Sequence, residues 1–273
     1  MNQTFSLSRF GRLLRTYFVE NRNVLLANVA VLFVGLAGLA FLIYSSFPWS
    51  IPRTRAMLLF FAGGVAWYVF TVQQITLLNE KERAITYLLR PASKLEKWAQ
   101  LVLVSGLGFI IAYTLLFTVI DTVGVWYVNH REWKPEQLKD LLDRSTIKPW
   151  FEPSQLREIP PMLWVDALLL HPVALALALL IRRYTLPLIP VILFFALILV
   201  ILINHQLLSG MIDSVKEVSA SPFDKMSVLR TSDDWKTVAL PQPVGDAIRY
   251  GVGALVMLLL YVMAFFRLKE REV

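Results

Sequence analysis

Two groups of residues in this chain are candidates for a functional role. The first lies in NEKERAITYLLRPASKLEKWAQ, residues 79–100, which holds the densest charge in the first half of the sequence. Charge beside apolar residues at helical spacing predicts a short amphipathic element that could transmit force from a partner protein. The second group is Asp166 and His171, which stand in a long apolar run. Ionisable groups in hydrocarbon are costly and often mark a proton or substrate path.

The Asp166 and His171 pair has two interpretations. Pro172 follows His171 directly and frees a backbone carbonyl, which a neighbouring group must satisfy. One hypothesis is therefore a substrate or proton site that lines a cavity. The alternative is structural, because Asp166 lies only a few residues from the predicted outer end of its span, where a carboxylate can reach water.

Other catalytic signatures are missing from the sequence. It holds no G-x-x-x-x-G-K-[ST] phosphate loop and no G-x-S-x-G elbow. The three histidines are dispersed, without the spacing of a metal site, and the absence of cysteine excludes disulfides, cysteine-ligated zinc and thiol nucleophiles. We therefore expect no enzymatic activity, no metal and no cofactor on this chain.

Composition places the chain in a membrane. Of its 273 residues, 56% are hydrophobic and 17% are charged, whereas soluble domains carry about 25% charge. The formal net charge is +7, but Lys and Arg sit in short clusters beside apolar runs, as in membrane proteins that orient by charge. Nucleic-acid binding is not expected, because it requires a continuous basic face.

The elements that position these residues are predicted to be helices throughout. We expect an all-α polytopic protein, one transmembrane domain over residues 1–273, with outside segments at 129–161 and 204–247. At about 20 apolar residues per crossing, six transmembrane helices are expected, at 24–44, 56–78, 101–128, 162–181, 186–203 and 248–266.

Residues 1–22 predict an amphipathic helix that lies in the lipid headgroup layer. Phe10, Leu13, Leu14, Tyr17 and Phe18 recur at helical spacing, and the arginines of this segment fall largely on the other side of the helix. Such a helix binds membrane lipid through apolar burial and through attraction to phosphate. The alternative is an ordinary soluble cap on the first span.

The distribution of Lys and Arg predicts that both termini and the segment 79–98 face the cytoplasm, because the excess positive charge falls there. Arg53 and Arg55, in the short first outside loop, oppose this rule. Within 79–100, Pro91 should stop one helix, and Ser93 followed by Glu96 has the spacing of a capping box that starts the next.

The arrangement E-x-x-R-A-I-x-x-L-L-x-P-x-S-K-x-E, residues 80–96, resembles the loop between the second and third spans of type-2 ATP-binding-cassette (ABC) exporter permeases. The six spans, the N-terminal helix and the large outside region before the last span also fit this family. Ala84 stands where glycine is common, and Gln100 and Leu101 stand where Gly-Lys is frequent. The positions that match are Glu80 or Glu82, Ala84, Leu88, Leu89, Pro91, Ser93, Lys94 and Glu96.

The resemblance implies a permease in the bacterial inner membrane, paired with a second permease subunit and with separate ATPase subunits that hold ATP and Mg. It implies that residues 80–90 form a coupling helix in a groove of the ATPase and that substrate passes along spans one, two and five. Leu88 and Leu89 would anchor this helix to the membrane. The ATPase-coupling residues would be Glu80, Glu82, Arg83, Ala84, Tyr87, Arg90 and Pro91.

Three rival functions stay open at this point. The first is a partner-independent carrier coupled to ions through Asp166 and His171. The second is a scaffold in a membrane complex, and the third is an immunity or regulatory subunit that binds ATPase without exporting substrate.

Overall fold

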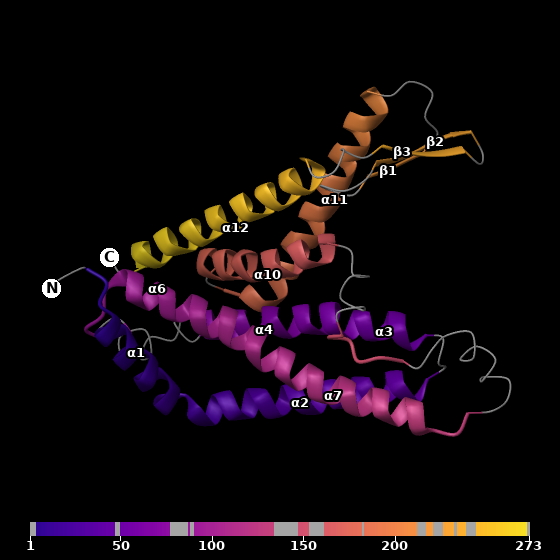
Figure 1. Ribbon diagram of the computed structural model, residues 1–273. Coiled ribbons are helices and arrows are strands. Elements are labelled where there is room, and N and C mark those ends of the chain that lie inside the picture. Colours follow the sequence, from indigo (N-terminus) through magenta and orange to yellow (C-terminus); the bar gives the residue numbers. More distant parts are fainter. Residues whose placement is uncertain are drawn as a thin grey trace. The chain divides into compact units, whose positions relative to one another are not determined.

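The computed structural model divides the chain into two compact units, Met1–Leu163 with Leu268–Val273, and Trp164–Arg267 (Figure 1). The structure describes residues 4–46, 50–76, 87, 90–133, 147–152, 161–181, 183–211, 217–220, 226–231, 234–238 and 244–271.

The first unit contains the N-terminal helix and three long helical rods. Two of these rods change from α-helix to a short π-helical segment and back without a break. The elements are α1 (Leu7–Glu20), α2 (Arg22–Ser45), α3 (Ile51–Met57), η1 (Leu58–Ala62), α4 (Gly63–Thr76), α6 (Lys94–Val102), η3 (Leu103–Gly108) and α7 (Phe109–His130).

The other described residues include three further helices and a small sheet. Helices α10 (Pro161–Leu180) and α12 (Val244–Arg271) extend past the limits of the second unit, and α11 (Thr185–Met211) lies within it. The strands β1 (Glu217–Ala220), β2 (Met226–Thr231) and β3 (Asp234–Val238) pair antiparallel in the order β1-β2-β3. On β2, Met226 lies opposite Ala220 of β1 and Val238 of β3.

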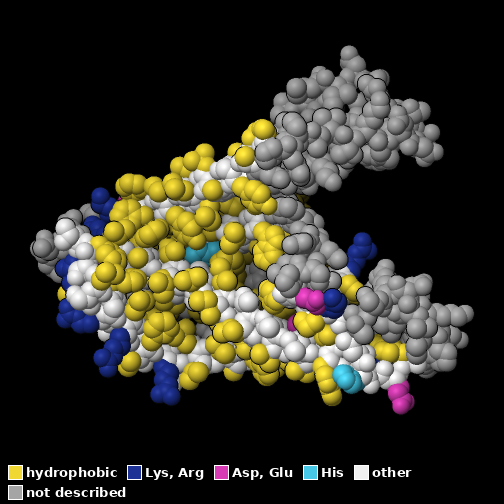
Figure 2. Space-filling model, viewed as in Figure 1, with side chains coloured by type: hydrophobic (Ala, Val, Ile, Leu, Met, Phe, Trp, Pro, Cys, Tyr) yellow, Lys and Arg dark blue, Asp and Glu magenta, His cyan; other side chains and the backbone are white. Residues whose placement is uncertain are grey.

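The prediction of a helical protein with six spans is confirmed, so the chain is a multi-pass membrane protein. The membrane-length apolar helices are Arg22–Ser45, Ile51–Thr76, Lys94–His130, Leu163–Leu180, Thr185–Ile203 and Tyr250–Glu270. Hydrophobic side chains cover the visible sides of the helices, while Lys and Arg gather at the end where α1 lies (Figure 2). The sheet within 204–247 is an addition that sequence analysis did not predict, and the cytoplasmic location of the termini stays a prediction.

Two spans begin earlier than predicted, because polar residues at their ends are satisfied inside the protein. The second helical rod begins at Ile51 and the third at Lys94, rather than at residues 56 and 101. The early start of the second rod places Arg55 in α3, where it is 1% exposed. Arg55 is therefore a buried structural residue of a helix. The excess of Lys and Arg in cytoplasmic loops, which its position opposed, does not apply to it.

Arg55 belongs to a buried polar cluster around Asp121 of α7, which is 2% exposed. The Arg55 guanidinium lies 3.7 Å from the Asp121 carboxylate and donates to the Lys148 carbonyl at 2.7 Å. Tyr44 of α2 also donates its hydroxyl hydrogen to Asp121, and the Trp150 backbone N–H donates to the same carboxylate at 2.7 Å. The cluster thus joins α2, α3, α7 and the segment 147–152.

The two π-helical segments are stabilised by aromatic side chains from the opposite rod. Tyr113 of α7 donates to the Leu58 carbonyl in η1 at 2.8 Å, and Trp67 of α4 donates to the Ser105 carbonyl in η3 at 2.7 Å. Carbonyls that leave the regular α-helical pattern need such partners in hydrocarbon. The rings of Trp67 and Phe109 stack between these two bonds, with centroids 5.9 Å apart.

Two glycines permit this close packing. A Cβ atom at Gly63 would lie 2.8 Å from the Tyr113 ring, and one at Gly124 would overlap the Tyr44 ring. On α2, the face that meets α7 consists of Leu36, Ala40 and Tyr44, four residues apart and all 3% exposed. Small residues therefore bring α2 and α7 close enough for Tyr44 to reach Asp121.

We predict that Asp121→Asn destabilises the protein by about 3 kcal/mol, because it leaves the buried Arg55 charge without its counter-ion. Unfolding of the purified protein in mixed detergent measures this change. Asp166→Asn is the matched control, since the Asp166 side chain is exposed, and its stability should stay within about 0.5 kcal/mol of the original. Equal stability of the two variants would contradict the role of the ion pair.

Candidate coupling site

Part of the predicted coupling segment lies outside the described residues, namely Glu80, Glu82, Arg83, Ala84, Leu88 and Leu89. The structure places Tyr87 and the run from Arg90 into α6. These residues form the end of the segment that joins the third span. Their contacts connect this end of the segment to α1 and α6.

The capping box predicted at Ser93 is confirmed. Ser93 Oγ accepts a hydrogen bond from the Glu96 backbone N–H at 3.2 Å, and a Glu96 carboxylate oxygen accepts from the Ser93 N–H at 2.7 Å. These reciprocal bonds satisfy donors at the helix start. They explain why α6 begins at Lys94, directly after the turn at Pro91.

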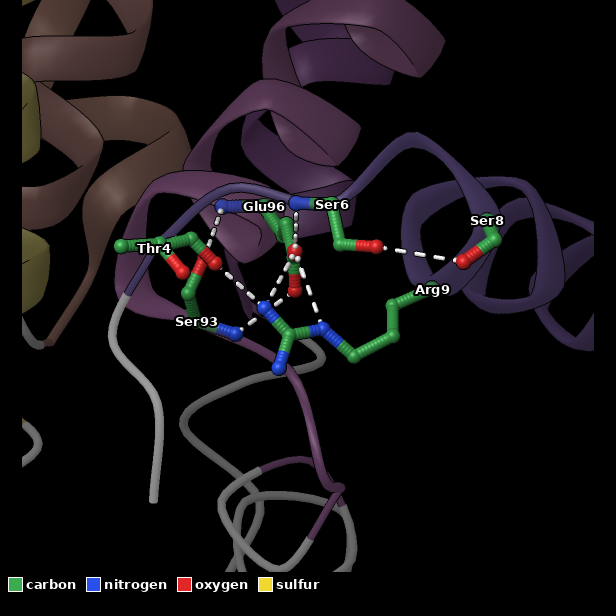
Figure 3. Close-up of polar contacts among 6 residues, drawn as sticks. All are labelled: Thr4, Ser6, Ser8, Arg9, Ser93 and Glu96. Carbon is green, nitrogen blue, oxygen red and sulfur yellow. Dashed lines mark hydrogen bonds and ion pairs between the residues drawn. The ribbon is translucent and has the colours of Figure 1, made fainter.

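Glu96 also contacts the start of α1, which its spacing from Ser93 did not predict. Its other carboxylate oxygen accepts from the Ser6 backbone N–H at 2.7 Å and from Arg9 Nε and Nη2 at 3.3 and 3.1 Å (Figure 3). The Glu96 residue is 0% exposed. One buried carboxylate therefore caps α6 and holds the first turn of α1 against it. We call these contacts of Glu96 the Glu96 clamp.

Arg9 completes the clamp from the side of α1. Its guanidinium also donates to the Thr4 carbonyl, so the chain before α1 folds back over the same group (Figure 3). A buried carboxylate needs both a counter-charge and hydrogen-bond donors to offset the loss of water. Arg9 supplies the charge, and the backbones of Ser6 and Ser93 supply additional donors.

Tyr87 and Arg90 connect the predicted coupling segment to its neighbours. The Tyr87 hydroxyl donates to the Lys97 carbonyl at 3.2 Å, and Lys97 Nζ lies 5.4 Å from the centre of the Tyr87 ring. Arg90 forms an ion pair with Glu20 at the end of α1. Pro91 is exposed and follows this pair.

A third contact holds the last turn of α1. The Tyr17 hydroxyl donates to the side-chain carbonyl of Gln74 in α4. Burial raises the pKa of Tyr17 to about 12, so its hydroxyl keeps the proton that this bond needs. Helix α1, predicted from its amphipathic pattern, is thus confirmed and linked to both the second and the third rod, while its place in the headgroup layer stays a prediction.

Arg90 and Glu96 thus connect the turn before α6 to α1, and the cap at Ser93 connects it to the third rod. Among the described residues there is no group of three or more His, Cys, Asp or Glu side chains that could hold a metal ion.

Asp166 and His171 do not meet. Five residues along an α-helix correspond to a rotation of about 140° beyond one full turn, so the two side chains leave α10 in different directions. Asp166 is exposed, whereas His171 is 1% exposed and its Nδ1 lies 2.8 Å from the Tyr261 hydroxyl of α12. The polar partner of His171 is therefore Tyr261, which sequence analysis did not select.

The first unit also contains an apolar pocket of about 410 Å³ between α2, α4 and the region of η3. Asn28 and Gln73 are the polar side chains of its lining, which otherwise includes Leu32, Phe70 and Phe109. The pocket thus lies among spans one, two and three.

Comparison of the chain with known protein families, with curated proteins and with solved structures gives no match.

The two functions of the clamp can be separated by substitution. Ser93→Ala removes the cap and should cost about 1 kcal/mol, with faster hydrogen exchange in the first turn of α6. Glu96→Gln can still cap but loses the charge that pairs with Arg9, so it should cost about 1.5 kcal/mol and accelerate exchange in the first turns of α1. Hydrogen–deuterium exchange with mass spectrometry measures both effects.

Glu152→Gln is the control for Glu96→Gln. It removes a carboxylate from the exposed Lys148–Glu152 ion pair, and exposed pairs contribute little. Exchange in α1 should stay unchanged in this control. Unchanged exchange in α1 of Glu96→Gln would show that the clamp does not hold the helix.

Proposed function

We propose that this chain is the permease subunit of an ATP-driven ABC exporter in the bacterial cytoplasmic membrane. It would pair with a second permease subunit and with separate ATPase subunits, which bind ATP and Mg. Support comes from the six spans, the helix α1 before the first span, and the resemblance of residues 80–96 to the coupling loop of this family.

The Glu96 clamp is the observation that carries the proposal. It links the end of the predicted coupling segment to α1 and to the third rod through one buried carboxylate. A solvated loop whose positive charge only set the orientation of the protein in the membrane would not need a buried ion pair of this kind. A segment pushed by a partner does need it, because force reaches the spans only through ordered contacts.

The proposed mechanism follows from these contacts. Closure of the ATPase dimer would displace the segment 80–90, and the Arg90–Glu20 pair and the Glu96 clamp would make α1 follow. The cap at Ser93 would carry the same displacement into the third rod. The π-helical segments η1 and η3 interrupt the regular helices of the second and third rods, and such segments often lie at points where helices adjust.

A face of α2 supports the pairing with a second permease subunit. Apart from the neighbouring residues and backbone of α2 itself, no described atom lies within 4 Å of the positions that a Cβ atom would take at Gly35 or Gly38. This small-residue face is therefore not used for packing by the described part of the chain. Small residues permit close approach of another transmembrane helix.

A carrier coupled to protons is the second candidate, and the contact between His171 and Tyr261 is the observation that favours it. Reconstituted chain alone would then move solute when a pH gradient is applied. The permease proposal expects no such movement without the ATPase.

We predict that affinity capture of the tagged, solubilised chain from its native membrane recovers a P-loop ATPase, and that Glu82→Lys lowers this recovery about tenfold through like-charge contact. Glu132→Lys makes the same charge reversal in the segment predicted to lie outside and should leave recovery unchanged. Absence of an ATPase, or equal loss in both variants, would refute the proposal.

The absence of cysteine allows a direct test of orientation. With a single cysteine at Glu80, a membrane-impermeant maleimide should label the protein only after the cells are opened. A single cysteine at Glu132 should be labelled in intact cells. The reverse pattern would place the predicted coupling segment outside and exclude contact with a cytoplasmic ATPase.

A further inference from the structure

A second cavity, of about 430 Å³, lies between α1 and the turn that precedes α6. Arg9, Arg12 and Thr16 of α1 line one side of it, and Arg90 lines the other. The other described residues of its lining are Leu13, Pro91 and Ala92. The described lining thus presents three guanidinium groups and a hydroxyl beside apolar side chains, and none of its residues is acidic.

The three arginines are not equivalent. Arg9 is paired with Glu96, and Arg90 is paired with Glu20. Both are therefore held in place beside the cavity by contacts that do not depend on a ligand. Arg12 is exposed, and none of the ion pairs between described residues includes it. Its guanidinium can therefore turn toward a ligand without breaking one of those pairs.

The cavity lies beside the ends of two membrane-length helices, where lipid phosphates are expected. Helix α1 ends just before the first span, which begins at Arg22, and Ala92 lies just before Lys94, where the third begins. The cavity is therefore at the ends of two spans, in the zone where headgroups meet basic side chains. Arginine is the side chain best suited to phosphate there, because its planar donors can form paired hydrogen bonds with phosphate oxygens.

We propose that this cavity binds the phosphate group of an anionic ligand, with Arg12 as the principal contact and with Arg9, Arg90 and Thr16 around it. A phosphate there would bridge α1 and the turn 90–92, and so strengthen the contacts made by the two ion pairs. This binding site goes beyond the proposed transport function and does not depend on it. The phosphate could come from a lipid headgroup or from a soluble phosphate, and the experiment separates these sources.

The experiment uses the purified full chain in a neutral detergent and follows its thermal unfolding by tryptophan fluorescence. The probes are dioctanoyl phosphatidylglycerol, dioctanoyl phosphatidylcholine and inorganic phosphate. The anionic lipid should raise the unfolding temperature in a saturable way. The zwitterionic lipid, whose phosphate is neutralised by choline, should bind at least several-fold more weakly.

Arg12→Gln should weaken binding of the anionic lipid about tenfold, since it removes one charged hydrogen-bond contact. Arg15→Gln is the matched control, because Arg15 is exposed on the same helix but does not line the cavity. It removes the same charge from α1 and should bind as the original chain does. Arg12→Lys, which keeps the charge, should recover part of the affinity and shows that the loss is not a folding defect.

Each outcome decides the proposal. Binding of the anionic lipid alone, lost in Arg12→Gln, supports a lipid phosphate site. Binding of inorganic phosphate as well, with the same dependence on Arg12, supports a site for soluble phosphates. The proposal is overturned if neither probe binds, or if Arg12→Gln and Arg15→Gln weaken binding equally, because α1 would then act only through its total charge.

Discussion

Two buried carboxylates on one helical rod organise the first unit. Glu96 lies near the start of the rod Lys94–His130 and Asp121 lies toward its end, and they are 0% and 2% exposed. At about 1.5 Å per residue, the helix between them is about 38 Å long, compared with about 30 Å for the hydrocarbon of a bilayer. A charge buried at either end must be paired inside the protein, so each carboxylate gathers donors from several elements around it.

The ends and the middle of this unit are therefore stabilised by different means. At one end, Glu96 holds α1 through Ser6 and Arg9, and at the other end Asp121 holds α2, α3 and the segment 147–152. Between them, the rods pack through rings and small residues, and their π-helical segments are satisfied by Tyr113 and Trp67. This division follows from the bilayer, because buried charges at the ends of the rods need polar partners and the middle of the rods lies in hydrocarbon.

Sequence reasoning found part of the candidate site. The capping box at Ser93 and Glu96 depends on residues three apart in one chain segment, and it was predicted correctly. The partner Arg9 was recognised only as a basic residue of the amphipathic helix. A glutamate that already caps a helix gives no signal, by spacing, that its second oxygen will be buried against a residue 87 positions away. The same holds for Arg55, which was expected in an outside loop although Lys and Arg favour the cytoplasmic side. The structure pairs it with Asp121 inside the protein.

Features that arise within one turn or one helix could be predicted from contiguous residues: the six apolar spans, the amphipathic α1 and the cap of α6. Each depends on local periodicity and composition, which a bilayer selects strongly. The folded structure was needed to show the partners of the buried charges, the first residues of the spans and the π-helical segments within them, and to show that His171 meets Tyr261 and not Asp166. These features depend on contacts between residues far apart in the chain, and several side chains of the same type could have supplied each contact.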